Sequence, residues 1–224
     1  MSSAYNIYFD QRTNCPVCNN LKTTNIFKKP FKDLKIKKFL DDYYQNKIPD
    51  QILEETEYSI EKCLKCTTLY QKYIFNDEQM FHLYEKWISK EQSLRKKSTS
   101  EISTFTRYVN ELEKVCKYLH KKPNEIDILE YGMGWGYWSN IAKALNFNVK
   151  GFEISKSRII NAKKKQIETI NDLKKLKENK FDFIYSFAVF EHIPNPKETL
   201  ELLKNLLKDN GLIYIYVPNG LFIE

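Results

Sequence analysis

Three glycines spaced two residues apart constrain the fold of this chain more than any other feature. Gly132, Gly134 and Gly136 follow an apolar run that begins at Ile128, and the residues after them suit a helix. Glycine accepts positive φ and places no Cβ between the backbone and a ligand, and a following helix presents N–H groups at its first turn. The pattern predicts a strand, a tight turn and a helix around a nucleotide-type cofactor. A turn with a purely structural role would use the same residues.

The spacing of the glycines separates two classes of cofactor. A dinucleotide-binding loop of the form G-x-G-x-x-G would have its third glycine where this chain has Tyr137. Here the third glycine is Gly136, and an acid lies two residues before the first glycine. With these features the loop resembles motif I of the class I S-adenosylmethionine-dependent methyltransferases. The resemblance implies that the cofactor is S-adenosylmethionine and that it contacts Glu130, Tyr131, Gly132, Gly134 and Gly136.

A second short strand, predicted from Asn148 to Ile154, carries an acid near its end. Glu153 lies about twenty residues after the first glycine, where a carboxylate can accept hydrogen bonds from both hydroxyls of a ribose. Ile154 would then lie against the adenine ring. The alternative is the ordinary polarity of a strand end, with no ligand.

The most apolar run of the chain, residues 181–190, predicts a strand buried on both faces. The residues from Phe181 to Pro196 resemble the motif that follows strand four in the same methyltransferases. The resemblance implies that Phe187 lies at the cofactor. His192 is our candidate general base, because its unperturbed pKa of about 6.5 suits proton removal. Glu191 would orient His192 or bind a substrate hydroxyl. Alternatively, His192 only caps the turn between strand and helix.

The resemblance covers about residues 127–219 and implies an α/β fold, a doubly wound parallel sheet with the cofactor at the carboxyl ends of its strands. A helix is expected from Pro196 until Asn210 and Gly211 close it, followed by strand five at residues 212–217. Strands six and seven of the family are missing from this sequence, so we expect an incomplete core. Strand five would then be an open edge that invites a second copy or a partner chain.

Four of the five cysteines form two C-x-x-C pairs, which predict a metal site. Two such pairs supply a closed tetrahedral shell of four sulfurs, so the zinc would be structural rather than catalytic. Reduced free thiols are the alternative. Asn19 suits a left-handed turn after the first pair, and Cys116 reads as a small buried side chain. The predicted zinc ligands are Cys15, Cys18, Cys63 and Cys66.

The order of parts resembles the sugar C-methyltransferases, in which a zinc-binding head precedes the methyltransferase core. We expect a zinc-binding, zinc-ribbon-like module at 1–75, a helical linker or cap at 76–122, and an S-adenosylmethionine-binding core at 123–224. Within the linker, 91–103 is polar and lacks apolar periodicity. Tyr84 and Trp87 are candidate pocket residues, although packing between helices is the simpler explanation for both aromatics.

Composition limits the partners. The chain carries 36 Lys and Arg against 29 Asp and Glu, for a net charge of +7, and only four of the basic residues are arginines. Scattered lysines usually form a solvated face, and arginine is the better phosphate reader. We expect no membrane span, no leader peptide and a cytoplasmic location.

Three functions remain open. The first is methyl transfer to a sugar or nucleotide-sugar, the second is methyl transfer to RNA by a zinc-headed enzyme, and the third is a non-catalytic module that binds zinc and cofactor.

Overall fold

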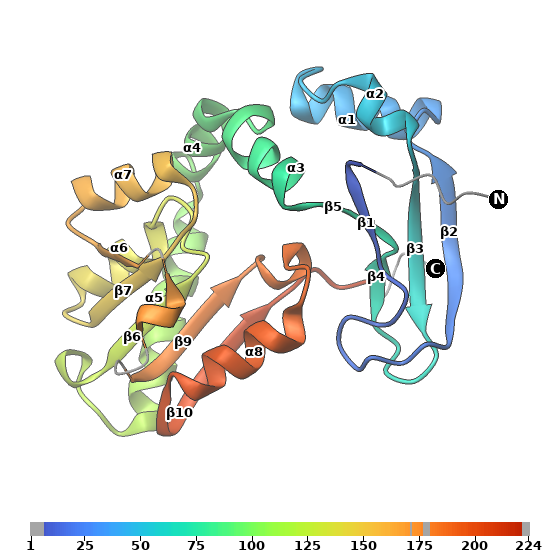
Figure 1. Ribbon diagram of the computed structural model, residues 1–224. Helices are drawn as coiled ribbons and strands as arrows, with labels where there is room; N and C mark the ends of the chain where they lie inside the picture. The colour runs from blue at the N-terminus through green and yellow to red at the C-terminus, as the bar shows by residue number, and fades with distance from the viewer. Residues whose placement is uncertain (1–6, 171, 177–179, 221–224) are drawn as a thin grey trace. The chain divides into compact units, whose positions relative to one another are not determined.

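The computed structural model describes residues 7–170, 172–176 and 180–220. These residues form two compact units, one built mainly from the chain up to Lys90 and one built mainly from Glu91 to Pro218 (Figure 1). This division falls inside the predicted linker at 76–122. The functional division into 1–75, 76–122 and 123–224 stays a prediction.

The second unit is organised around one parallel sheet. Its central strands β6 and β9 are buried almost throughout, as expected for strands covered on both faces. All neighbouring strands pair in parallel. The spatial order is β10 (Leu207–Tyr216), β9 (Phe181–Phe187), β6 (Asp127–Tyr131), β7 (Asn148–Phe152) and β8 (Glu168–Ile170).

Helices cover both faces of this sheet. On one face, α5 (Ile102–Leu119) and α6 (Tyr137–Ala144) bury Leu112 and Trp138 against Phe183. On the other face, α8 (Pro196–Asn205) buries Leu203 against Ile184. Alternate side chains of a strand point to opposite faces, so one strand serves both cores. The doubly wound α/β fold is therefore confirmed.

Shorter elements complete the second unit. Helix α7 (Lys156–Lys164) follows β7, and 3-10 turns lie at Pro123–Glu125, Leu173–Leu176 and Phe190–His192. Strand β10 pairs with β9 alone among the described strands, so it is the edge that the sequence predicted.

Two predicted boundaries were wrong. Helix α8 ends at Asn205 rather than at Asn210, because Leu207 already pairs with Phe181 and the chain bulges before pairing resumes at Leu212. The segment taken as a linker at 91–103 contains α4 (Lys90–Ser98), a helix without buried residues. Its polar composition hid the helix, because a helix that is polar all round carries no amphipathic signal.

The first unit contains two small antiparallel sheets. One has the order β2 (Thr23–Pro30), β3 (Glu57–Cys63) and β4 (Leu69–Gln71), and the other pairs β1 (Phe9–Gln11) with β5 (Tyr73–Phe75). Between β2 and β3 the chain forms α1 (Leu34–Tyr44) and α2 (Asp50–Glu54). The two cysteine pairs are therefore separated by an inserted folded segment, as the long spacing predicted.

Aromatic packing holds the first unit together. Helix α3 (Asp77–His82) continues into a π-helical turn at Leu83–Trp87. Trp87 is 5% exposed and belongs to a core that also contains Phe9 and Phe31, while Tyr84 packs against the same core. Both aromatics therefore pack helices, the simpler of the two expectations. Among the described residues, no helix is long and apolar enough to span a membrane.

A charged cluster ties the amino ends of β6, β9 and β10 together. Asp182 accepts hydrogen bonds from Lys121 Nζ at 2.6 Å, Lys208 Nζ at 2.8 Å and the backbone N–H of Asp127 at 2.9 Å. The Asp182 side chain is 4% exposed. Burial alone would raise the pKa of Asp182, but the two lysines and the N–H group lower it below its usual value.

We predict that Asp182→Asn lowers the free energy of unfolding at pH 7 by about 2 to 3 kcal/mol, because it weakens charge-assisted bonds to a buried group. The loss should shrink as the pH falls below about 4, because the carboxylate takes up a proton first in the unfolded chain and, at lower pH, in the folded protein as well. Chemical denaturation at pH 7 and pH 3 measures both values. The control is Glu113→Gln, which breaks an exposed ion pair with Lys117 and should leave the free energy of unfolding nearly unchanged, because water and salt screen such a pair. Equal costs for the two variants would contradict the prediction.

Candidate functional site

The glycine loop between β6 and α6 adopts the predicted geometry. Gly132, Gly134 and Gly136 have φ values of +74°, +57° and +67°. A Cβ on Gly132 would lie 2.5 Å from Val189 Cγ2, so this glycine allows the segment after β9 to approach the loop. A Cβ on Gly134 would meet nothing within 4 Å. The first glycine therefore serves packing, and the second leaves open space where a ligand can approach the backbone.

Most N–H groups of the loop have acceptors inside the protein. Gly132 and Met133 donate to the carbonyl of Phe152 at 2.9 and 3.1 Å. Gly134 donates to Glu153 Oε2 at 2.8 Å, and Ser139, in the first turn of α6, donates to Glu130 Oε2 at 3.0 Å. The sequence led us to expect a first turn that offers N–H groups to a ligand, but the N–H of Ser139 is taken by Glu130 and that of Gly136 by the Met133 carbonyl. Fewer N–H groups are therefore left for a pyrophosphate, which is bound by such groups.

Glu153 lies just after β7 and is 4% exposed. Its Oε1 accepts the N–H groups of Ile154 and Ser155, both at 2.9 Å, and its Oε2 accepts Gly134. Arg158 Nη1 lies 3.7 Å from Oε2. These bonds fix the carboxylate at the carboxyl edge of the sheet. Ile154 beside it is 67% exposed, so its side chain is available as an apolar platform.

Glu130 lies below the loop and is buried. Its Oε2 accepts both the N–H and the hydroxyl of Ser139. Burial raises the pKa of Glu130 to about 7, although the bonds from Ser139 act in the opposite direction. The neighbouring Tyr131 is 9% exposed, and its ring stacks on Phe152 at 5.1 Å between ring centroids. The Tyr131 side chain is therefore part of the core.

The segment after β9 carries the other predicted site residues. Phe187 stacks on Tyr216 with ring centroids 4.2 Å apart, and the guanidinium carbon of Arg107 lies 4.5 Å from the Phe187 ring centroid. In the 3-10 turn that follows, His192 Nε2 lies 3.8 Å from Glu191 Oε1. The His192 side chain is 53% exposed. The two residues are neighbours at the carboxyl edge, and His192 is open to solvent.

Several residues near the loop were missed from the sequence. Trp135 donates its indole N–H to Ser93 Oγ of α4 at 3.0 Å, which fixes α4 to the loop. Arg107 and Arg158 lie against Phe187 and Glu153. The sequence has only four arginines, and the fold brings two of them to this edge, which their positions in the sequence do not predict. Ala188 has φ of +55°, and no feature of an alanine could have predicted this.

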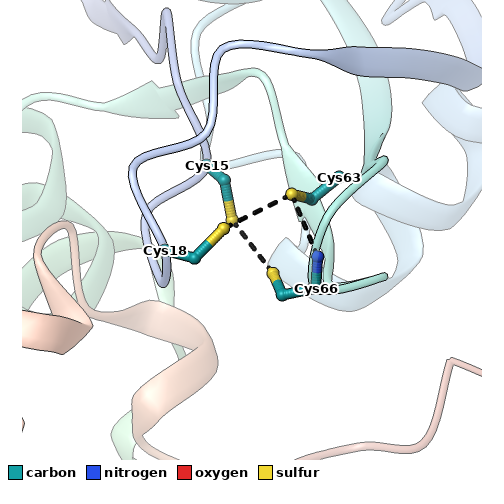
Figure 2. Close-up of side chains that lie close together, drawn as sticks. All are labelled: Cys15, Cys18, Cys63 and Cys66. Carbon is teal, nitrogen blue, oxygen red and sulfur yellow. Dashed lines mark hydrogen bonds between the residues drawn. The ribbon is translucent and has the colours of Figure 1, made fainter.

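The four predicted zinc ligands lie together (Figure 2). Their sulfurs lie within 4.8 Å of one another, and Cys15–Cys66 and Cys18–Cys63 are each 3.5 Å apart. A tetrahedral zinc with bonds of about 2.3 Å separates its sulfurs by about 3.8 Å, so the four thiols fit this ion. They do not form disulfides.

Backbone geometry around the cysteines supports thiolate ligands. The N–H groups of Lys65 and Cys66 point at Cys63 Sγ, at 3.4 and 3.5 Å. The hydrogen bond from Cys66 lowers the pKa of the Cys63 thiol. Asn19 has φ of +59°, which gives the predicted left-handed turn after the first pair. A thiolate is the form that binds metal, so these N–H groups favour metal binding.

The fold and this edge define a class of protein. A parallel sheet, a glycine loop after its central strand and a buried acid after the neighbouring strand are the parts of a nucleoside-cofactor-binding α/β protein. The family model described as "Methyltransferase domain" matches residues 102–222, more than half of the chain. The chain belongs to this methyltransferase family.

Curated relatives have similar sequences. A ubiquinone biosynthesis O-methyltransferase from Glaesserella parasuis is 29% identical over 119 residues, which are 46% of this chain and 50% of that protein. A malonyl-[acyl-carrier protein] O-methyltransferase from Ilyobacter polytropus is 30% identical over 138 residues, which are 58% of this chain and 52% of that protein. The chain spans about half the length of these relatives.

Solved structures give similar matches. The plantazolicin methyltransferase BpumL, in complex with a pentazolic desmethylPZN analog and SAH, is 25% identical with a TM-score of 0.47. The match covers 55% of this chain and 50% of that chain.

We predict that Glu130 makes stability fall as the pH rises from about 5 to about 7. The folded protein holds the Glu130 proton up to about pH 7, whereas the unfolded chain releases it near pH 4.3, so the folded state loses relative stability as the pH rises between these values. Relative to Glu130→Gln, the wild type should lose about 2 to 3 kcal/mol over this range. Urea denaturation of both proteins across the range measures the difference. Parallel pH profiles would contradict the raised pKa.

Proposed function

We propose that the chain binds S-adenosylmethionine at the glycine loop and transfers its methyl group to a small molecule, with a sugar or nucleotide-sugar as the acceptor. The observation that carries the proposal is the Glu153 carboxylate, fixed beside a glycine with open space above it. A carboxylate with an acceptor position left can bind a ribose hydroxyl, and S-adenosylmethionine carries a ribose without a pyrophosphate. Family membership supports the same cofactor.

In this proposal each residue at the carboxyl edge of the sheet has its own role in binding the cofactor. Glu153 holds the ribose, Ile154 lies against the adenine, and Gly134 leaves room for the ligand to approach the loop. The bound cofactor supplies an electrophilic methyl group on a sulfonium. The protein has to hold an acceptor in line with that methyl group, and such positioning can lower a barrier by about 7 to 11 kcal/mol.

His192 is the proposed general base. A hydroxyl acceptor has to lose a proton as it attacks, and an imidazole can take that proton, which speeds such reactions by about 10² to 10⁴. Glu191, 3.8 Å from the imidazole, would orient the ring or stabilise its charged form. The named curated relatives are O-methyltransferases, which supports an oxygen acceptor.

The cofactor proposal predicts a specific loss on mutation. Glu153→Ala should weaken S-adenosylmethionine binding by about 1.5 to 3 kcal/mol, because a charged acceptor for the ribose is removed. Calorimetric titration of the wild type with S-adenosylmethionine and with NAD tests the cofactor class at the same time. The control is Glu168→Ala, which removes an exposed acid at β8 and should leave the affinity unchanged. Unaltered binding by Glu153→Ala, or tighter binding of NAD, would refute the proposal.

We also propose that Cys15, Cys18, Cys63 and Cys66 hold one structural zinc ion. The four thiols form a closed shell, which leaves no position for a reacting ligand. The ion would stabilise the first unit, whose sheets are small.

Native mass measurement should find one zinc per chain, and Cys63→Ser should lose it and unfold at lower temperature. Cys116→Ser is the matched control, because Cys116 lies on α5 outside the cluster and should keep the ion. Wild-type protein without metal, or Cys63→Ser with full zinc content, would exclude the site.

A further inference from the structure

Arg158 lies beside the carboxylate to which we assign the ribose. It is the third residue of α7, and its Nη1 lies 3.7 Å from Glu153 Oε2. The two side chains are 19% and 5% exposed, so the pair is largely shielded from water. At this distance the contact is an ion pair rather than a short hydrogen bond, and a competing group can break it.

Glu153 does not need Arg158 to stay in place. Its orientation is already set by three backbone N–H groups, those of Gly134, Ile154 and Ser155, at 2.8 to 2.9 Å. An ionised carboxylate offers about four acceptor positions. Three are therefore taken by the backbone, and the one that is left belongs to Oε2, the oxygen that lies 3.7 Å from Arg158 Nη1. A ribose hydroxyl that binds Glu153 would use this oxygen and so compete with Arg158 for it.

The Arg158 guanidinium also contacts an aromatic ring. Its central carbon lies 5.9 Å from the centroid of the Trp135 ring, within the range of a cation–π contact. Trp135 is 8% exposed and is held by Ser93 at its indole N–H and by Asn161 and Lys165 at its carbonyl. Arg158 can therefore leave Glu153 with a small movement and keep a favourable contact with a fixed ring.

We infer that Arg158 is a positioning residue that occupies Glu153 in the ligand-free protein and has to be displaced by the ribose, so that it lowers the affinity of the site. This inference rests on the proposed binding of a ribose at Glu153. It assigns to Arg158 a role opposite to that of a residue that contacts the cofactor. Removing the arginine would strengthen binding and weaken the ligand-free fold.

Calorimetric titration of the full chain with S-adenosylhomocysteine and with adenosine tests the inference. Arg158→Met keeps the length and removes the charge, and it should bind both ligands about three to ten times more tightly, as expected when a weak ion pair no longer has to be broken. Arg158→Lys should restore the wild-type affinity in part. Lys156→Met removes an exposed cation from the same helical turn and should bind like the wild type.

Salt separates competition from a merely structural role. Rising salt weakens a partly buried ion pair less than an exposed one, so wild-type affinity for S-adenosylhomocysteine should improve by a small factor between about 0.05 and 0.5 M salt, and Arg158→Met should lack this improvement. In the ligand-free protein, a double-mutant cycle of Arg158→Met with Glu153→Gln in chemical denaturation should show favourable coupling. Neither readout depends on catalysis.

Several results would overturn the inference. Weaker binding by Arg158→Met would make the arginine a cofactor contact, and unchanged binding would mean that no competition exists. Zero coupling in the cycle would exclude the ion pair. If only S-adenosylmethionine fails to bind while adenosine binds as predicted, the methyl donor proposal fails and the role of Arg158 stands. If no ribose ligand binds either protein, both fail.

Discussion

The carboxylate of Glu153 is the contact on which the site depends. One oxygen takes the N–H groups of the two residues that follow it, and the other takes the N–H of Gly134 in the loop after β6. Two neighbouring strands are thereby joined at their carboxyl ends through a single buried charge. Glycine tolerates the three positive φ angles of the loop because it has no Cβ. Hydrogen bonds then hold the loop in place: Gly132 and Met133 donate to the Phe152 carbonyl, and Ser139 at the start of α6 donates to Glu130.

This use of the N–H groups decides which ligands suit the loop. In a dinucleotide-binding turn the same groups point at phosphate oxygens. Here several of these N–H groups donate to acceptors inside the protein. Open space is left at Gly134, and Ile154 is exposed beside a fixed carboxylate. Such a surface suits a nucleoside better than a phosphate. The buried Glu130 beneath it keeps a second acid close to the loop, with its pKa raised by burial to about 7.

Much of this architecture could be predicted from the sequence. The glycine spacing, the acid at 153 and the apolar run from Phe181 are local patterns with strong stereochemical causes, and they placed β6, β7 and β9 correctly. The cysteine spacing predicted a cluster that the fold brings together across 45 to 51 residues of chain. These features are readable because one residue type at one spacing has few structural uses.

Other features depend on contacts between distant residues, which a single sequence does not encode locally. Helix α4 has no apolar face, and its place near the loop follows from one bond between Ser93 and Trp135. The early end of α8 follows from the pairing of Leu207 with Phe181 and from the lysine bridge at Lys208. Arg158 became visible as part of the site only when α7 was placed beside β7.

The most direct test of the account is a crystal structure of the protein grown with S-adenosylhomocysteine. The account predicts a ribose hydroxyl within hydrogen-bonding distance of Glu153 Oε2, the adenine against Ile154, and Arg158 moved away from Oε2. A ligand bound elsewhere on the chain, or the same edge filled by a pyrophosphate-bearing compound in a parallel soak with NAD, would contradict it.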